Sequence, residues 1–316
     1  MLAVVLLGCS DGSGGAADSS AAQGYPVTVA DCGKDVTVAK APERVLTVGT
    51  AAVEILDAAG ASQKIIARTG EFGAPLPASL THRPDDSLIV DPSDPTTENI
   101  IVANPDLVFG YGLFNADPAQ IRKSGITMLT VQGECGHDAS TDAAPTVDLG
   151  TIGADVRRLG TVFGTSATAD AAASALDKRI AAARRAPTGH TAAWVYYFSS
   201  EDPLSAYGGS GLPNAMLNSA GLQNAYADQH ETYATISTES LIRRQPEWIV
   251  VKYGGYGESE ADARAKFLAE PGVSTLEAVR AGRIVMLPAD SSNPSPSAVD
   301  SFEKLVAATA ATVPSR

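Results

Sequence analysis

The chain has 316 residues, of which 44% are hydrophobic and 19% are charged, and its formal net charge is -13. This composition is typical of a globular protein, and the length accommodates two domains of ordinary size. The acidic balance excludes a nucleic acid or an anionic membrane surface as a partner held by bulk electrostatics, because such binding requires a basic face.

The first ten residues, MLAVVLLGCS, form an apolar run that ends at Cys9. The run is too short to span a bilayer, and it resembles the lipobox of bacterial lipoproteins, in which the cysteine carries the lipid. No positive charge precedes it, so either translation starts further upstream or the match is accidental. The Gly/Ser/Ala-rich stretch that follows favours the lipoprotein. We therefore expect residues 1–24 to be a lipoprotein signal and flexible tether, with Cys9 anchoring the chain to the outer face of the cell membrane.

The next part of the chain alternates strand and helix signals. A hairpin sequence, PVTVADCGKDVTV, turns near Gly33. A buried strand follows, then a helix that Gly60 closes, and then a second strand. A polar, proline-rich stretch is expected to wrap the surface before a further strand. These five segments are residues 44–48, 52–59, 64–67, 83–95 and 126–131.

A short pattern occurs twice: TENIIVANPDLVFGYG begins at residue 97, and TESLIRRQPEWIVVKYG begins at residue 238. Glu98 and Glu239 lie 141 positions apart, and so do Pro105 and Pro246. In each copy a hydroxyl residue and an early glutamate indicate a capped helix, which the proline ends before a short apolar strand. A helix followed by a continuously apolar strand is typical of a parallel sheet covered on both faces. The two copies therefore predict two α/β lobes.

Two helices are predicted between the copies. Residues 148–163 have helical periodicity, and the alanine-rich run 167–186 is a strong helix candidate of about five turns. The second half then repeats the alternation, with a strand at 190–199, helices at 212–219 and 261–268, a strand at 283–287 and a terminal helix at 297–311. We expect an N-terminal lobe over residues 25–165, a connecting helix over 166–187 and a C-terminal lobe over 188–316.

The chain contains three cysteines. If Cys9 carries a lipid, then Cys32 and Cys135 remain, and an even remainder in an exported protein indicates one disulfide. Both residues fall in predicted loops that could meet. The alternative is two unrelated buried thiols.

A family resemblance rests on the order of several motifs. PVTVADCGKDVTV, PERVLTV, EILDAAGASQKIIA and TENIIVANPDLVFG are followed by SAGLQNAYAD, TESLIRRQPEWIVV and AVRAGRIVMLP. In this order they resemble the solute-binding subunits of ABC importers for ferric siderophores, cobalamin and haem. The Cys32 and Cys135 pair is most similar to the actinobacterial ferric-siderophore lipoproteins of that family.

The resemblance implies two Rossmann-like lobes with mainly parallel sheets, joined by one long rigid helix, with the ligand in the cleft between them. It also implies that Glu98 and Glu239 match the glutamates that meet arginines of the permease dimer. The function expected is capture of an iron(III)-siderophore complex by a monomer and its delivery to that permease. Cobalamin or haem as ligand, and a sensor without a transporter on the same fold, remain alternatives.

Ligand-binding residues are expected in the loops that follow the strands, because the crevice of an open parallel sheet lies beyond the carboxyl ends of its strands. Aromatic side chains there offer flat apolar surface, and Arg68 and Lys252 offer one cation per lobe for an anionic ligand. For each aromatic residue the alternative is core packing, which is favoured for Trp194 and Tyr196. The expected ligand-binding residues are Thr50, Arg68, Phe72, Tyr111, Phe114, Tyr207, Lys252, Tyr253 and Tyr256.

No catalytic or metal-binding motif stands out in the sequence. The four histidines lack the i, i+4 spacing of a helical zinc site, and the cysteines lack C-x-x-C spacing. Neither a G-x-S-x-G elbow nor a P-loop is present. We therefore expect no enzyme, no cofactor and no metal held by protein side chains, with iron bound through the siderophore.

Overall fold

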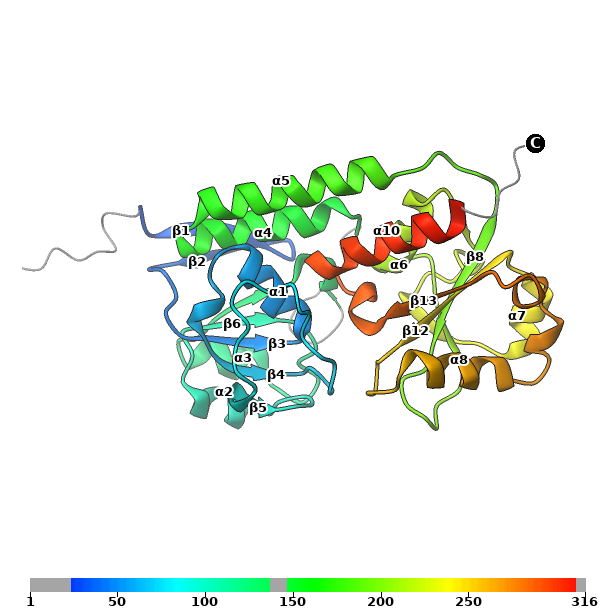
Figure 1. Cartoon of the computed structure of the whole chain (residues 1–316). Coiled ribbons are helices and arrows are strands. Elements are labelled where there is room, and N and C mark those ends of the chain that lie inside the picture. The colour runs from blue at the N-terminus through cyan, green and yellow to red at the C-terminus, as the bar shows by residue number, and fades with distance from the viewer. Residues whose placement is uncertain (1–23, 137–146, 311–316) are drawn as a thin grey trace, which may run out of the picture.

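The computed structural model describes residues 24–136 and 147–310. Cys9 and nearly all of the predicted tether lie outside the described residues. Within them the chain forms two α/β lobes, with long helices running along one side of both (Figure 1). The predicted fold class is confirmed. No helix in this part of the chain combines the length and apolarity that crossing a bilayer requires.

The N-terminal lobe is built on a five-stranded parallel sheet in the order β5-β4-β3-β6-β7. Val45 of β3 packs in the main core, whereas Leu46 and Val48 join a smaller cluster with Ile100 and Ile121. Both faces of the sheet are therefore buried, as the apolar strands predict. The elements are β3 (Val45–Val48), α1 (Thr50–Ala58), β4 (Ile65–Thr69), β5 (Ile89–Asp91), α2 (Thr97–Ala103), β6 (Leu107–Gly110), α3 (Pro118–Lys123) and β7 (Thr127–Thr130).

The C-terminal lobe contains a mixed sheet in the order β11-β9-β8-β12-β13, with β10 beside β8. β8, β10, β12 and β13 run parallel, whereas β9 pairs antiparallel with β8 and β11. The short strands β9, β10 and β11 were not predicted, because two or three residues carry too little periodicity. The elements are β8 (Thr191–Tyr196), β9 (Ser205–Tyr207), α6 (Gly211–Ser219), β10 (Gln223–Asn224), β11 (Tyr233–Thr235), α7 (Thr238–Arg244), β12 (Trp248–Tyr253), α8 (Glu260–Ala269), α9 (Glu277–Arg280), β13 (Ile284–Pro288) and α10 (Pro296–Ala310).

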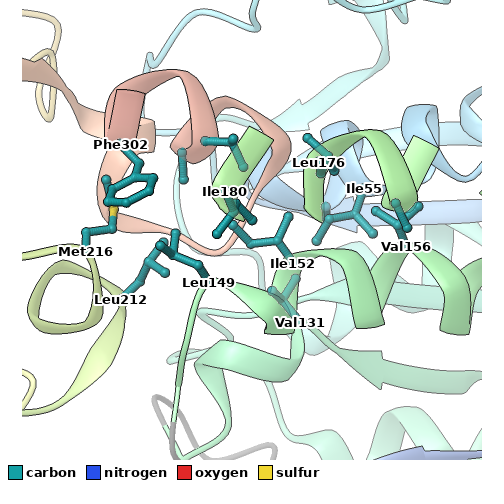
Figure 2. Packing of buried hydrophobic residues seen from close by; sticks show 14 of the residues in the cluster. Ile55, Val131, Leu149, Ile152, Val156, Leu176, Ile180, Leu212, Met216 and Phe302 are labelled. Carbon is teal, nitrogen blue, oxygen red and sulfur yellow. The ribbon is translucent and has the colours of Figure 1, made fainter. Parts of the chain in front are cut away.

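Three long helices connect the lobes. α4 (Gly150–Phe163) and α5 (Ser166–Ala183) pack along each other, and α5 also packs against α10 of the C-terminal lobe. One hydrophobic core continues through this region. Figure 2 shows Ile180 of α5 between the side chains of the N-terminal lobe and Phe302 of α10. The two lobes therefore share their main core.

The predicted connecting helix is present but ends at Ala183, four residues before the predicted end at residue 187. Arg184 has extended backbone, and the segment after it pairs with the loop that follows α6. In that pairing Arg185 N donates to Ser219 O at 2.9 Å and Thr188 N donates to Gly221 O at 2.8 Å. These backbone hydrogen bonds compete with continued helix, so the alanine-rich composition alone predicted too long an element.

The two copies of the repeated pattern adopt the same local structure. The hydroxyl oxygens of Thr96 and Ser237 cap α2 and α7, each accepting a hydrogen bond at 3.2 Å from a backbone N–H three residues on. Both helices end at a left-handed residue, Asn104 or Gln245, directly before the proline. A strand, β6 or β12, follows in each lobe. The internal repeat is thus confirmed as one helix-turn-strand unit used twice.

An acidic residue after each proline ties the unit to the neighbouring strand. The Asp106 carboxylate accepts from Glu43 N and Arg44 N at 2.9 and 3.0 Å, just before β3. The Glu247 carboxylate accepts from Thr191 N at 3.0 Å, at the start of β8. The two acids therefore hold equivalent strands in the two lobes.

The N-terminal hairpin joins β1 (Val27–Asp31) to β2 (Lys34–Val38) and is fastened to the lobe at its turn. Cys32 forms a disulfide with Cys135 across a sequence separation of 103, which confirms the predicted pairing. Asp31 beside it accepts hydrogen bonds at 2.8 Å from Thr130 N and from Arg158. Cys32 also has a positive φ of 48°, as a tight two-residue turn requires.

Candidate ligand-binding cleft

A cavity of about 390 Å³ lies between the lobes, which is a size typical of small-molecule sites. Its walls come from the loops after β3, β4 and β6 in one lobe and from β8, β9, β11, β12 and the residues after β13 in the other. This is where the crevice rule for parallel sheets places a ligand. We call this cavity the cleft.

The N-terminal wall of the cleft presents exposed aromatic side chains. Phe72 and Phe114 are 51% and 57% exposed, and Tyr111 and Thr50 lie beside them. Phe72 has a positive φ of 49°, and its N–H donates to the carbonyl of Pro92 at 2.7 Å. A large aromatic residue in left-handed backbone is uncommon, and such strain is often found at functional sites.

The C-terminal wall is an aromatic cluster around one lysine. The rings of Tyr196 and Tyr207 stack with centroids 4.7 Å apart, and Phe198 packs edge-on against Tyr196 at 4.9 Å and against Tyr233 at 5.3 Å. The ammonium of Lys252 lies 4.3 Å from the centre of the Tyr196 ring and donates to the Tyr207 hydroxyl at 3.1 Å. Burial raises the pKa of Tyr196, so its phenol stays neutral.

Arg68 does not line the cleft, in contrast to the prediction. Its side chain is buried, and the guanidinium forms a bidentate ion pair with Glu71 at 2.7 and 2.8 Å. It also contacts Asp86 at 3.0 Å and donates to two backbone carbonyls of the loop between β4 and β5. Because Glu71 and Asp86 occupy the guanidinium, Arg68 fastens this loop to β4 and offers no cation to a ligand.

Two tyrosines expected in the cleft also lie elsewhere. Tyr253 and Tyr256 pack against the second core cluster of the C-terminal lobe, and the Tyr256 ring lies 5.8 Å from Lys266 of α8. The glycines that flank these tyrosines allow the turn to fold back onto α8. The cleft thus brings together six of the nine expected residues: Thr50, Phe72, Tyr111, Phe114, Tyr207 and Lys252.

Several lining residues were not among the expected set. Tyr196 was assigned to the core because it lies within a strand, and Tyr233 lies on a strand too short to be recognised. Phe198 lies near the end of the predicted strand 190–199, and Asp290 follows the predicted strand 283–287, but neither was named as a ligand-binding residue. The alternation in TYATIST, which begins at residue 232, was the available signal for Tyr233.

Two carboxyl groups, one buried between the lobes and one lining the cleft, have pKa values raised by burial. Glu54 of α1 is 3% exposed and accepts hydrogen bonds at 2.8 and 2.9 Å from the backbone N–H and hydroxyl of Ser297 in α10. Burial raises the pKa of Glu54 to about 8. Asp290 lines the cleft, and burial raises its pKa too. The Glu54–Ser297 contact joins the two lobes directly.

A second cavity of about 560 Å³ adjoins the cleft and shares Glu134, Thr232 and Ser292 with it. Its lining consists mainly of small polar residues from the loop before residue 137 and from α6. It lacks the aromatic walls of the cleft. Among the residues that the structure describes, no group of three or more His, Cys, Asp or Glu side chains could hold a metal ion.

Glu98 and Glu239 lie outside the cleft, exposed in the first turns of α2 and α7. The pKa of Glu239 is lowered by hydrogen bonds from its own backbone N–H and from Ser237. The two helices belong to different lobes (Figure 1). The repeat therefore presents one accessible glutamate per lobe.

The fold and the cleft define a two-lobed binding protein. The family model described as "Periplasmic binding protein" matches residues 45–291, which is most of the chain. The protein belongs to this periplasmic binding protein family.

Individual relatives are more distant. The chain is 25% identical over 266 residues to YvrC of Bacillus subtilis, an uncharacterized ABC transporter substrate-binding lipoprotein, covering 80% of this chain and 78% of YvrC. It is 24% identical over 229 residues to the vitamin B12-binding protein of Pectobacterium atrosepticum, covering 71% and 76%. The crystal structure of an ABC-type Fe3+-hydroxamate transport system from Saccharomonospora viridis superposes with a TM-score of 0.75 at 22% identity, covering 90% and 99%.

Proposed function

We propose that this protein captures an iron(III)-siderophore complex outside the cytoplasm and delivers it to an ABC permease. The observation that carries the proposal is the inter-lobe cleft with exposed aromatic side chains on both walls. Exposed phenylalanines are costly in water, so a ligand with flat or apolar surface is the expected occupant. The family membership and the YvrC relative support the role of a solute-binding protein for an ABC permease, and the structurally similar S. viridis protein belongs to an Fe3+-hydroxamate transport system.

Iron is carried by the chelate in this proposal. The described residues offer no cluster of metal ligands, and the phenols that line the cleft include Tyr196 and Tyr111, whose pKa values are raised by burial. Neutral phenols are poor ligands for a bare ferric ion, whereas they donate hydrogen bonds to the oxygens of a chelate. The protein acts as a binding protein rather than an enzyme, and as a monomer.

Delivery rests on the two exposed glutamates. Glu98 and Glu239 are presented by the same helix-turn-strand unit, one from each lobe, and a permease dimer offers one matching site per subunit. Each carboxylate would pair with a basic residue of the permease. A lipid on Cys9 would keep the protein at the outer face of the membrane, close to that partner.

Native mass spectrometry tests the ligand class. We expect a one-to-one complex with a ferric siderophore and at least about tenfold weaker binding of cyanocobalamin and haem. Replacing Phe72 and Phe114 together by Ala should weaken the complex by at least about tenfold, because both side chains would lose buried contact area. Leu268→Ala is the matched control, since Leu268 is 39% exposed on α8 outside the cleft. Preferential binding of cyanocobalamin, the ligand of the Pectobacterium relative, would replace iron with cobalamin in the proposal.

A further inference from the structure

The cleft contains little positive charge. Lys252 is the one lysine or arginine among the described residues that line it. Its ammonium already contacts the rings of Tyr196 and Tyr207 at 4.3 and 5.6 Å and donates to the Tyr207 hydroxyl. These cation–π contacts stabilise the ammonium within the protein. An anion that pairs with Lys252 would therefore have to compete with these contacts.

The N-terminal lobe does not supply the missing charge. Arg68 is bound to Glu71 and Asp86, and the side chains of Arg68 and Glu71 are only 2% and 4% exposed. Glu71 itself lines the cleft. The charge balance of this wall is thus neutral at best.

Asp290 adds a negative group on the opposite side. It lines the cleft, and its Oδ1 atom is buried with no hydrogen-bond partner among the described residues. A buried acceptor without a partner favours a ligand that brings a donor or a positive charge. It disfavours a ligand that brings further anionic oxygens.

The aromatic walls have the same preference. The face of each phenol or phenyl ring carries the negative part of its quadrupole, so it attracts cations and tolerates neutral groups. Phe198 and Tyr233 line the cleft and are 51% and 38% exposed, so part of this aromatic surface can contact a ligand.

Ferric chelates differ in charge in a way that this cleft can distinguish. Three hydroxamates, each with one negative charge, neutralise iron(III), whereas three doubly charged catecholates leave a trianion. One partly engaged lysine cannot offset the desolvation of a trianion in a cleft that also holds Glu71 and Asp290. Resting on the proposed function, we propose that the cleft takes an uncharged or cationic ferric chelate of the hydroxamate type and discriminates against polyanionic chelates.

Three ferric probes test this on the purified full chain: ferrichrome, which is uncharged, ferrioxamine B, a monocation, and ferric enterobactin, a trianion. Quenching of tryptophan fluorescence reports binding, because Trp194 lies 6.1 Å from Tyr207, measured between ring centroids. We expect the first two to bind at least about a hundredfold more tightly than the trianion. Equal or tighter binding of ferric enterobactin overturns the inference and leaves the proposed function intact. If none of the three binds while cyanocobalamin or haem does, the inference and the proposed function are both contradicted.

A charge variant separates the local effect from the overall charge of the protein. Asp290→Asn should narrow the gap between ferrichrome and ferric enterobactin by about fivefold or more, because it removes a negative group from the cleft. Glu277→Gln makes the same change in net charge on α9, where Glu277 is exposed and pairs with Arg283, and should leave the gap unchanged. Thermal melts of both variants check that they fold. An unchanged gap in folded Asp290→Asn, or an equal narrowing in both variants, contradicts the role of Asp290.

Discussion

The two lobes are built from one repeated unit, yet they offer a ligand different chemistry. Each lobe has a capped helix that ends in a left-handed residue before a proline. The acidic residue after that proline, Asp106 or Glu247, binds the backbone of the neighbouring strand. Tyr111 and Lys252 lie 141 positions apart, as the glutamates do, and both line the cleft directly after or within the repeated strand. The comparison shows that the repeat fixes where a side chain reaches the cleft. The identity of that side chain then sets what each wall can bind.

The most severe test of the comparison addresses the two glutamates. Changing Glu98 and Glu239 together to Lys should abolish or strongly reduce uptake in cells that carry the cognate permease, because both of the proposed docking contacts would become repulsive. Ligand affinity should stay at the wild-type value, since neither residue lines the cleft. Radiolabelled ferric siderophore uptake at equal expression is the measurement. Normal transport by the double variant would mean that Glu98 and Glu239 serve only to stabilise the first turns of their helices.

Arg68 and Lys252, the two basic residues expected in the cleft, should differ in how much they contribute to stability. Arg68→Ala leaves Glu71 buried without its partner and should lower the free energy of unfolding by about 3–5 kcal/mol. Lys252→Ala should lower it by no more than about 1 kcal/mol, because it loses mainly the cation–π contact of a partly exposed lysine and one hydrogen bond to a hydroxyl. Urea denaturation followed by circular dichroism measures both. Similar losses in the two variants would contradict the assignment of Arg68 to the scaffold.

Asp106 and Glu247, the acidic residues after the two prolines, provide a matched pair of variants with smaller expected losses of stability. Asp106→Ala removes the acceptor of two backbone N–H groups and should cost about 1–2 kcal/mol. Glu247→Ala removes the acceptor of one backbone N–H and a hydrogen bond to His190, and should cost about the same. The same denaturation experiment compares them. A large loss of unfolding free energy in one variant and none in the other would show that this acidic residue stabilises one lobe only.

A further test concerns the pH dependence of the contact between the lobes. Glu54 has its pKa raised by burial from 4.5 to about 8, so the folded protein keeps this proton where the unfolded chain has lost it. The protonated Glu54 carboxyl therefore contributes its full stabilisation of the folded state below about pH 4.5, and this contribution is lost as the pH rises through about 8. Glu54→Gln should flatten this decline in melting temperature between about pH 5 and pH 8. An unchanged slope would mean that other groups cause it.

The sequence predicted the scaffold better than the site. The repeat, the lobes and the disulfide followed from patterns that local physics enforces, such as capping, proline and cysteine parity. The side-chain contacts in the loops of the cleft did not follow from such patterns, because a residue type alone does not reveal its partners. Arg68 has the same sequence signature whether it faces a ligand or Glu71. Tyr253 and Tyr256 were misplaced because the path of a glycine-rich turn depends on what it packs against.

The core that continues through α4, α5 and α10 also determines how the molecule comes apart. Because the lobes share buried side chains such as Ile180 and Phe302, neither can lose its packing and leave the other intact. Unfolding should therefore be a single cooperative transition, with one calorimetric peak rather than two. A ligand that binds the folded state then raises the melting temperature of the whole chain by mass action. Heating the protein with each candidate chelate thus ranks the ligands without any label.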